Sequence, residues 1–443
     1  MSVPMNHYKD LIRLGLPIML GQLGVIVLSF VDTMMVGHCG TAELGAASFV
    51  NNMFNLVIVF STGFSYGLTP VVGGYYGKGD VAAAGGILKT SLCVNGLTGL
   101  VLTGLMLALY MCVHLLGQPE ELLGLIRPYY LTLLFSLVFI LVFNAFKQFF
   151  EGVTDTMTPM FILIASNVLN IFGNWLLIYG NFGFPRLGLV GAGISTLSAR
   201  IMMLVAALLV FLFSGRYKEF RKGFHEKSIN RSDFMLLNKL GLPVGLQMGM
   251  ETGSFSLSTI MVGWLGTVAL AAHQIMITVG QLGFMLYYGM AAAVAVKVSN
   301  YKGVGDTMSI RNTVKAGFNL ILLMALFVSL FMLLFRKSLG LLFTESAEVA
   351  AMVANLIIPF VIYQFGDGMQ CNYSNALRGI SDVKMVTWYA FLAYFVISLP
   401  SAYLFGFIMD LGLIGIWMSF PLGLTSAGLM FRRRFLKTLE KDS

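Results

Sequence analysis

Charge is the scarcest property of this sequence. Asp, Glu, Lys and Arg make up only 11% of its 443 residues, whereas 57% are hydrophobic and the mean hydropathy is +0.83. No soluble domain of this size has such a composition, so the class that it indicates is a multi-span membrane protein embedded in a lipid bilayer. The formal net charge of +8 therefore needs no nucleic-acid partner to explain it.

Sequence patterns that would indicate an enzyme or a cofactor are also scarce. The four cysteines have no metal or redox spacing, lie mostly in apolar runs and are interpreted as packing residues. No H-E-x-x-H motif or P-loop is present, so nothing indicates ATP use and no cofactor is predicted. Residues Gly63–Gly67 fit G-x-S-x-G, but that motif needs a strand before it, and here it lies within a predicted helix. We therefore do not predict an enzyme.

Long apolar runs fill almost the whole chain. Each is long enough for a bilayer that needs about 20 helical residues. The breaks between the runs predict twelve helices, at 11–37, 44–76, 85–114, 122–149, 157–180, 189–213, 233–263, 268–302, 310–335, 347–377, 384–409 and 413–435. The first run is interpreted as a retained helix and not as a signal peptide.

The chain repeats itself at an offset of 226 residues. Gly15 and Gly241 begin similar GLP segments, and the motif ending at Asp80 returns at Asp306. A period this long indicates a duplicated half and not a solenoid repeat. The only long polar connector predicts three parts: a lobe at 1–213, a solvated cytoplasmic linker at 214–232 and a second lobe at 233–443.

Basic residues predict the orientation in the membrane. With the N-terminus inside, 23 of the 28 Lys and Arg residues fall on the inner side. Both halves then start inside and contain six helices, so we expect an all-α protein with two lobes related by a pseudo-two-fold axis along the membrane normal, and a cleft between them. The prediction is a multi-pass plasma-membrane protein, an inner-membrane protein in bacteria, with both termini cytoplasmic.

Two acids lie within apolar runs of the second half. Each belongs to a polar stripe spaced i, i+4, i+7, i+11 on its helix; the stripes are Gln247, Glu251, Ser254, Ser258 and Tyr363, Asp367, Gln370, Ser374. An acid at the centre of a membrane helix costs about 2.5–3.5 kcal/mol on insertion scales. We therefore interpret these two acids as functional residues and not as purely structural ones. Glycines at 241, 245, 249 and 253 form a separate stripe for close helix packing.

A third membrane acid, Asp32, belongs to the first half. Its predicted partners share one face of a later helix and are Asn167, Asn170 and Asn174. An acid surrounded by amide oxygens is suited to holding Na⁺ or a proton. A purely structural, hydrogen-bonding role remains the alternative for all three acids.

Other polar residues have plainer interpretations. His273 is expected to be structural, and Arg378 is expected to reach toward the inner membrane surface. Four aspartates at inner loops are predicted to cap turns or helices; they are Asp80, Asp155, Asp306 and Asp382.

Four segments resemble the multidrug and toxic compound extrusion (MATE) transporters, in particular their NorM-like branch. They are FVDTMMVGHCG (30–40), NVLNIFGNW on the helix with the asparagines, METGSFSLSTIMVGWLG (250–266) with AAHQI (271–275), and YQFGDGMQCNYSNALRGISD (363–382). The resemblance implies export of small organic cations in exchange for Na⁺ or H⁺ by a monomer whose cleft alternately faces the two sides. It also implies a first site of Asp32, Asn170 and Asn174, and a second cation site of Glu251, Tyr363 and Asp367 that accommodates Na⁺. Asn174 stands where some branches carry an aspartate. This difference argues against a proton mechanism confined to the first site and favours Glu251 and Asp367 as the residues that bind the coupling ion.

Two other functions compete with this interpretation. A flippase for a lipid-linked oligosaccharide, from the same superfamily, would need basic residues for the diphosphate of its substrate, whereas this interior offers acids and only Arg200. A channel fits less well, because two similar lobes suit rocking better than a fixed pore. The sequence does not choose between Na⁺ and H⁺.

Overall fold

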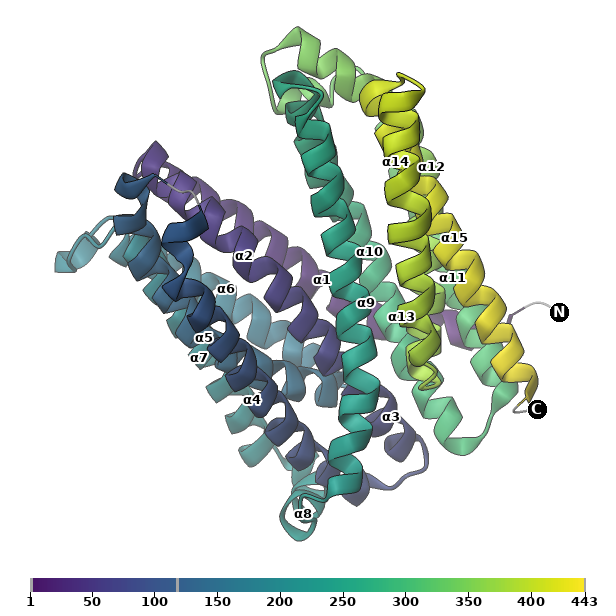
Figure 1. Ribbon diagram of the computed structural model, residues 1–443. Coiled ribbons are helices and arrows are strands. Elements are labelled where there is room, and N and C mark those ends of the chain that lie inside the picture. The colour runs from purple at the N-terminus through teal and green to yellow at the C-terminus, as the bar shows by residue number, and fades with distance from the viewer. Residues whose placement is uncertain (1–2, 117–118, 442–443) are drawn as a thin grey trace. The chain divides into compact units, whose positions relative to one another are not determined.

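The protein is an all-α membrane protein. A computed structural model describes residues 3–116 and 119–441. Its α-helices, shown in Figure 1, are α1 (Met5–Gly37), α2 (Thr41–Ser65), α3 (Thr69–Gly77), α4 (Val81–Met111), α5 (Glu120–Gly152), α6 (Met157–Leu177), α7 (Leu189–Phe213), α8 (Lys218–Glu226), α9 (Arg231–Gly263), α10 (Thr267–Val304), α11 (Thr307–Leu334), α12 (Ala347–Gly379), α13 (Lys384–Phe391), α14 (Leu399–Tyr403) and α15 (Gly412–Lys441).

Short 3₁₀ and π segments join several of these helices. The 3₁₀ turns are η1 (Tyr66–Leu68), η2 (Val113–Leu116), η3 (Asn181–Gly183), η4 (Gly215–Tyr217) and η5 (Gly340–Leu342). Two π segments, η6 (Leu392–Ser398) and η7 (Leu404–Ile408), interrupt the helical rod that runs from Lys384 to Ile408. Such π turns are often found at functional sites, and η6 contributes a tyrosine to the site described below.

Eleven helical segments within residues 3–116 and 119–441 are long and apolar enough to cross a membrane. The remaining long helix, α9, has 33 residues, the same number as α1, α5 and α12. Its hydropathy is reduced by Gln247, Glu251 and a run of hydroxyl residues. Together these twelve segments confirm the predicted polytopic all-α class.

Contacts divide the chain into two compact units whose limits fall inside helices. The first unit is residues 20–245, and the second unit combines residues 1–19 with residues 246–443. The limits at 19 and 245 are 226 positions apart, which is the offset of the sequence repeat. The start of α1 therefore packs with the second unit, where Asp10 pairs with Lys297 at 2.6 Å. The start of α9 packs with the first unit. In each half of the repeat, the beginning of the first helix therefore packs in the unit that consists mainly of the other half.

The connector 214–232 is more ordered than a solvated linker. Its η4 and α8 bury Tyr217 and Phe220 against aromatic side chains of α5 and α7. Ring centroids of Phe149 and Phe220 lie 5.4 Å apart, edge to face, and those of Phe150 and Tyr217 lie 5.1 Å apart. Gly85 of α4 meets the backbone of Phe220 so closely that a Cβ would not fit. The connector is thus an integral part of the first unit.

The predicted glycine stripe on α9 packs along only half of its length. A Cβ at Gly241 would lie 2.5 Å from the carbonyl oxygen of Phe64, and one at Gly245 would lie 2.9 Å from that of Phe60. Gly249 and Gly253 have no described atom within 4 Å of a Cβ. The prediction of close packing is therefore confirmed at the start of α9, at Gly241 and Gly245.

Two of the loop aspartates, Asp80 and Asp306, confirm the repeat at atomic detail. Asp80 accepts a hydrogen bond from the backbone N–H of Ala83, and Asp306 accepts one from that of Ser309, both at 2.9 Å. The side-chain and backbone hydrogen bonds from Ser309 hold the pKa of Asp306 below its usual value. Both aspartates are N-caps, as predicted. Thr154 and Ser381, which precede the other two aspartates, share a left-handed φ of 63°.

Candidate functional site

Three elements of the second unit meet at Glu251 on α9. The Gln370 side chain, from α12, donates its Nε2 hydrogens to Glu251 Oε2 at 3.2 Å and to the Tyr394 hydroxyl at 2.9 Å. Tyr394 stands in the π segment η6. One amide therefore ties the predicted acid to its neighbours, which fixes the position of the Glu251 carboxylate.

Asp367 lies in the same interior and is 1% exposed. Its Oδ1 accepts a weak hydrogen bond from Cys371 Sγ at 3.8 Å, whereas its Oδ2 has no hydrogen-bond partner among the described residues. The charge of Glu251 acts on Asp367, so the two acids predicted from the polar stripes do share one electrostatic environment. A buried carboxylate oxygen without a donor is unstable unless a proton or a cation satisfies it.

Further unsatisfied polar atoms lie near Asp367. Both polar atoms of the Gln364 side chain and the Tyr287 hydroxyl are buried without partners among the described residues. A Cβ placed on Gly283 would lie 3.1 Å from Gln364 Oε1 and 3.5 Å from the Tyr287 oxygen, so these two groups border the same glycine. Sequence reasoning missed both residues, although Gln364 is only three positions before Asp367. Together they extend the polar interior of the second unit.

Arg378 is buried among side chains of the second unit, where we expected a side chain that reaches toward the inner membrane surface. Only 4% of it is exposed. Its guanidinium donates to Gln247 Oε1 at 2.9 Å, and to the Tyr288 and Asn375 side chains at 3.4 Å each. Its positive charge also acts on Glu251. The sequence contained a signal for this position, because Arg378 is four residues after Ser374 and so continues the polar stripe that begins at Tyr363.

The remaining predicted residues of the second half are close to the acids but hold different partners. Gln247 binds Arg378 and neither acid, while the Ser254 hydroxyl donates to the Glu251 carbonyl oxygen at 2.9 Å. Tyr363 is 8% exposed, and its ring lies 5.7 Å from that of Phe360 and 6.3 Å from that of Trp417. Its phenol is within electrostatic range of Asp367.

His273 is held in a structural network, as its plainer interpretation predicts. Trp417 Nε1, which can only donate, lies 3.1 Å from His273 Nδ1, and the Thr259 hydroxyl lies 3.0 Å from Nε2. The neutral ring therefore carries its hydrogen on Nε2. Both ring nitrogens are occupied, which leaves neither for a ligand.

The first unit brings Asp32, Asn170 and Asn174 together. Asn174 Nδ2 donates to Asp32 Oδ1 at 2.5 Å and to Asn170 Oδ1 at 3.1 Å. With the Asn170 amide in the swapped orientation, the bond from Asn174 to Asn170 is replaced: Asn170 Nδ2 donates to Asp32 Oδ1 at 3.0 Å, and its Oδ1 accepts from the Thr196 backbone N–H at 3.3 Å. The third predicted partner, Asn167, is half-buried; its Nδ2 is buried without a partner among the described residues and makes no bond to Asp32.

Arg200 of α7 gives the first site a nearby positive charge. Its guanidinium donates to Ser136 Oγ at 2.6 Å, and its charge acts on Asp32. Tyr129, which donates to Asn51 at 3.1 Å, is also within electrostatic range of Asp32. Each unit thus contains an interior arginine near an interior acid, a correspondence that the polar stripes alone do not predict.

Clusters of conventional metal ligands are not part of either site. Across residues 3–116 and 119–441, no three His, Cys, Asp or Glu side chains lie together in a way that could hold a metal ion. Coordination of Na⁺ at Glu251, Asp367 and Tyr363 would depend on amide, phenol and carboxylate oxygens.

The sites lie in a fold that is similar to known transporters. The chain matches the structure of a eukaryotic MATE transporter with a TM-score of 0.88 at 18% identity, covering 99% of this chain and 98% of that one. A mutant of the Vibrio cholerae MATE transporter VcmN matches with a TM-score of 0.89 at 19% identity and the same coverage. An outward-facing multidrug resistance MATE family transporter matches with a TM-score of 0.87 at 22% identity, covering 98% of this chain and 97% of that one.

The sequence matches a family model in both halves. The MatE model matches residues 17–176 and again residues 243–404, with the two matches starting 226 positions apart. This repetition coincides with the internal duplication and includes the helices that carry Asp32, the three asparagines, Glu251 and Asp367. The chain therefore belongs to the MatE family of transporters.

Proposed function

We propose that this protein is a secondary active multidrug efflux transporter that exports small organic cations in antiport with Na⁺ or H⁺ by alternating access. The observation that carries the proposal is Asp367, a buried carboxylate whose Oδ2 has no donor among the described residues and on which the charge of a second acid, Glu251, acts. Leaving such a group ionised and unpaired costs several kcal/mol. Binding of a proton, Na⁺ or an organic cation removes that cost, so the site is suited to exchanging one cation for another.

In this mechanism Glu251, Asp367 and Tyr363 bind the coupling ion. Gln370 holds Glu251 in place through its hydrogen bond, and Gln247 holds Arg378, which contributes a fixed positive charge. An ionised carboxylate attracts the organic cation, and loading it with a proton or Na⁺ removes the attraction. Substrate and coupling ion then exclude each other, which is the requirement for antiport.

Asp32, Asn170 and Asn174 form an additional cation site in the first unit. The carboxylate there already accepts bonds from amides and lies near Arg200. It is therefore better satisfied than Asp367, and we assign it a secondary role. The working form is a monomer in the plasma membrane with both termini in the cytoplasm.

The alternative is a flippase for a lipid-linked oligosaccharide, and the arginines near the two acid sites, the buried Arg378 and the half-buried Arg200, are the observation in its favour. Arg378 is 4% exposed and engaged by three side chains, and Arg200 is engaged by Ser136. Each also lies near an acid that offsets its charge. A diphosphate would need cations that are free to turn toward it. The organic-cation assignment is therefore preferred.

The test is efflux of a fluorescent cation from proteoliposomes, with Na⁺ and pH gradients imposed separately and no ATP. Glu251→Gln and Asp367→Asn should each abolish gradient-driven efflux while the protein still folds and inserts. Glu348→Gln is the matched control, because this exposed acid stands in the first turn of the helix that carries Asp367. Efflux at the wild-type rate in either acid variant would disprove the assignment. Transport of a lipid-linked sugar and not of the cation would favour the flippase.

A further inference from the structure

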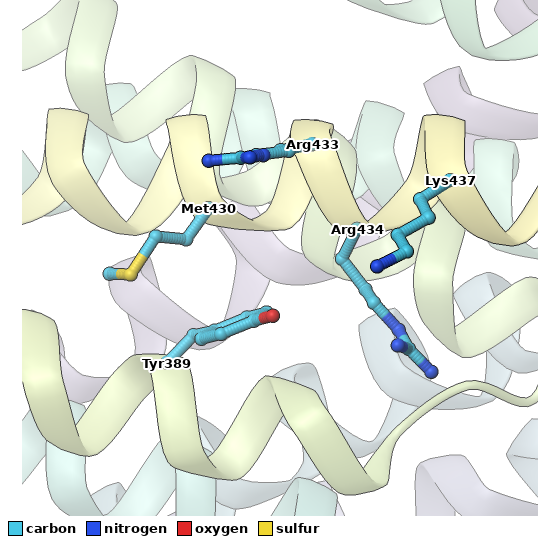
Figure 2. A pocket seen from close by; sticks show the side chains of 5 residues that line it. All are labelled: Tyr389, Met430, Arg433, Arg434 and Lys437. Carbon is cyan, nitrogen blue, oxygen red and sulfur yellow. The ribbon is translucent and has the colours of Figure 1, made fainter.

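A basic pocket lies between α13 and α15, near the C-terminal end of α15. It has a volume of about 270 Å³, and Figure 2 shows the side chains that line it: Tyr389, Met430, Arg433, Arg434 and Lys437. All five belong to the second unit. The pocket contains no residue of the two cation sites, and the inference below does not rest on the proposed transport function.

Two of the three positive charges in the pocket are not compensated. Arg434 donates to both carboxylate oxygens of Asp382, at 2.6 and 3.2 Å, so that ion pair offsets its charge. Arg433 and Lys437 are exposed and make no ion pair with residues 3–116 or 119–441. They stand four positions apart, so their side chains share one face of α15. Two neighbouring uncompensated cations are suited to binding a phosphate.

The same face of α15 becomes apolar toward the other end of the helix. Met418, Leu422 and Leu429 are 38%, 43% and 52% exposed. They stand four and then seven positions apart, and Arg433 follows Leu429 by four, so all of them share one face of the helix. On the adjacent α13, the Trp388 side chain is 59% exposed, as expected for an aromatic residue at a membrane interface. The surface thus combines an apolar stripe with a basic end.

With Gly412 at one boundary of the hydrocarbon core, the length of α15 brings its basic end to the headgroup level at the other boundary. α15 starts at Gly412, and 21 residues separate it from Arg433. At 1.5 Å per residue this is about 32 Å, close to the roughly 30 Å of a hydrocarbon core. A cation at that height meets lipid phosphates and not acyl chains.

We propose that this pocket binds the phosphate headgroup of an anionic phospholipid. The phosphate contacts Arg433 and Lys437, and an acyl chain lies along Met418, Leu422 and Leu429. Basic pockets between transmembrane helices on the cytoplasmic side bind acidic headgroups in this manner. A free phosphate would use the cations alone, whereas the adjoining apolar stripe favours a lipid as the source of the phosphate.

The experiment measures binding of phosphatidylglycerol to the full-length detergent-purified protein by native mass spectrometry, over a range of lipid concentrations. Parallel titrations use phosphatidylcholine and glycerol phosphate. The test variant is the double substitution Arg433→Gln with Lys437→Gln. Its matched control is Lys218→Gln with Lys222→Gln, which removes two exposed positive charges from α8. Size-exclusion chromatography checks that each variant is folded, and Lys437→Gln alone serves if the double variant is not.

A basic residue at an anionic membrane surface contributes about fivefold to binding, so the double variant should bind phosphatidylglycerol about 30-fold more weakly. The single variant should lose about fivefold, and the control should bind like wild type. Wild-type protein should bind phosphatidylcholine and glycerol phosphate much more weakly than phosphatidylglycerol. Equal binding by the test and control variants would overturn the proposal. Glycerol phosphate binding as tightly as phosphatidylglycerol would overturn the role of the acyl chain and leave a small-anion site.

Discussion

Removing one hydroxyl, with Tyr217→Phe, should loosen the connector between the halves. Tyr217 is 1% exposed, and its hydroxyl donates to Asp155 Oδ2, which is itself buried. Asp155 keeps its bonds from Thr158 and its ion pair with Arg216 at 3.2 Å. Phenylalanine retains the aromatic packing, so the substitution isolates the hydrogen bond.

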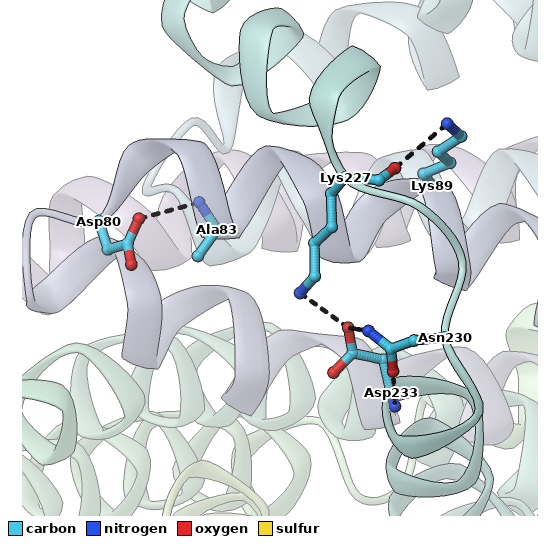
Figure 3. Close-up of polar contacts among 6 residues, drawn as sticks. All are labelled: Asp80, Ala83, Lys89, Lys227, Asn230 and Asp233. Atoms are coloured by element: carbon cyan, nitrogen blue, oxygen red, sulfur yellow. Dashed lines mark hydrogen bonds and ion pairs between the residues drawn. The ribbon is translucent and has the colours of Figure 1, made fainter.

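The expected magnitude follows from the charge of the acceptor. A hydrogen bond to an ionised group contributes about 1.5–3 kcal/mol, so local opening of η4 and α8 should become about 10- to 150-fold more frequent. Arg216 is 55% exposed on its side chain and adds little that could compensate. The far end of α8 stays attached, because Lys227 pairs with Asp233 at 2.7 Å and Lys89 donates to the Lys227 carbonyl at 3.2 Å, as Figure 3 shows.

Hydrogen exchange of the backbone amides from 215 to 226 measures this opening. Tyr76→Phe is the control, because the Tyr76 ring stacks on Phe220 at 6.4 Å while its hydroxyl has no hydrogen bond to the described residues. Exchange in the control should equal that of wild type. A change below twofold in Tyr217→Phe would refute the reasoning.

The effect should also have a defined pH range. Burial, and then the hydrogen bond to Asp155, raise the pKa of Tyr217 above its usual value of 10.0. A group whose pKa is higher in the folded than in the unfolded protein stabilises the folded state fully at pH values below its unfolded pKa. That contribution is lost as the pH rises from the unfolded pKa through the folded pKa. The difference between wild type and Tyr217→Phe should therefore be constant from about pH 6 to 9 and shrink above about pH 10. A difference that disappears below pH 8 would indicate another cause.

Three further predictions concern the ion, the caps and the topology. Raising Na⁺ or H⁺ on the substrate's side should lower the equilibrium affinity for an organic cation, and affinity that stays constant over the whole range would exclude competition at the carboxylates. Asp306→Ala should destabilise α11 by about 1 kcal/mol in thermal unfolding, whereas Asp306→Asn keeps the cap. Because its pKa is lowered, the ionised cap contributes fully above the ordinary value of 3.8, and the wild-type advantage over Asp306→Asn should be lost as pH falls below it. Cysteine introduced at Ser228 should resist labelling from outside intact cells, and efficient labelling would overturn the predicted orientation.

Features that depend on local sequence could be predicted well. The GKGD and GVGD motifs give the same cap at Asp80 and Asp306, because a left-handed glycine and the following aspartate determine the turn by themselves. The polar stripes likewise indicated Glu251 and Asp367, since residues four apart on one helix share a face whatever surrounds it.

Features that depend on a partner helix could not be predicted. Gln247 and Arg378 are 131 positions apart in the chain, and only the packing of α9 with α12 brings them together. Gly241 packs against the carbonyl oxygen of Phe64, which is 177 positions away in the chain. A helix sequence shows which face is polar or small, whereas the approach of another helix to that face depends on the whole unit.

The duplicated aspartates show how one local motif acquires two uses. Asp155 and Asp382 both follow a residue with φ of 63°, and both bind the chain that ends their own half. Asp155 holds Arg216 and Tyr217, where the chain leaves α7 and begins the connector. Asp382 holds Arg434, because α15 continues as a helix to Lys441. This continuation places Arg433 and Lys437 beside the ion pair of Asp382 and Arg434, where they line the basic pocket.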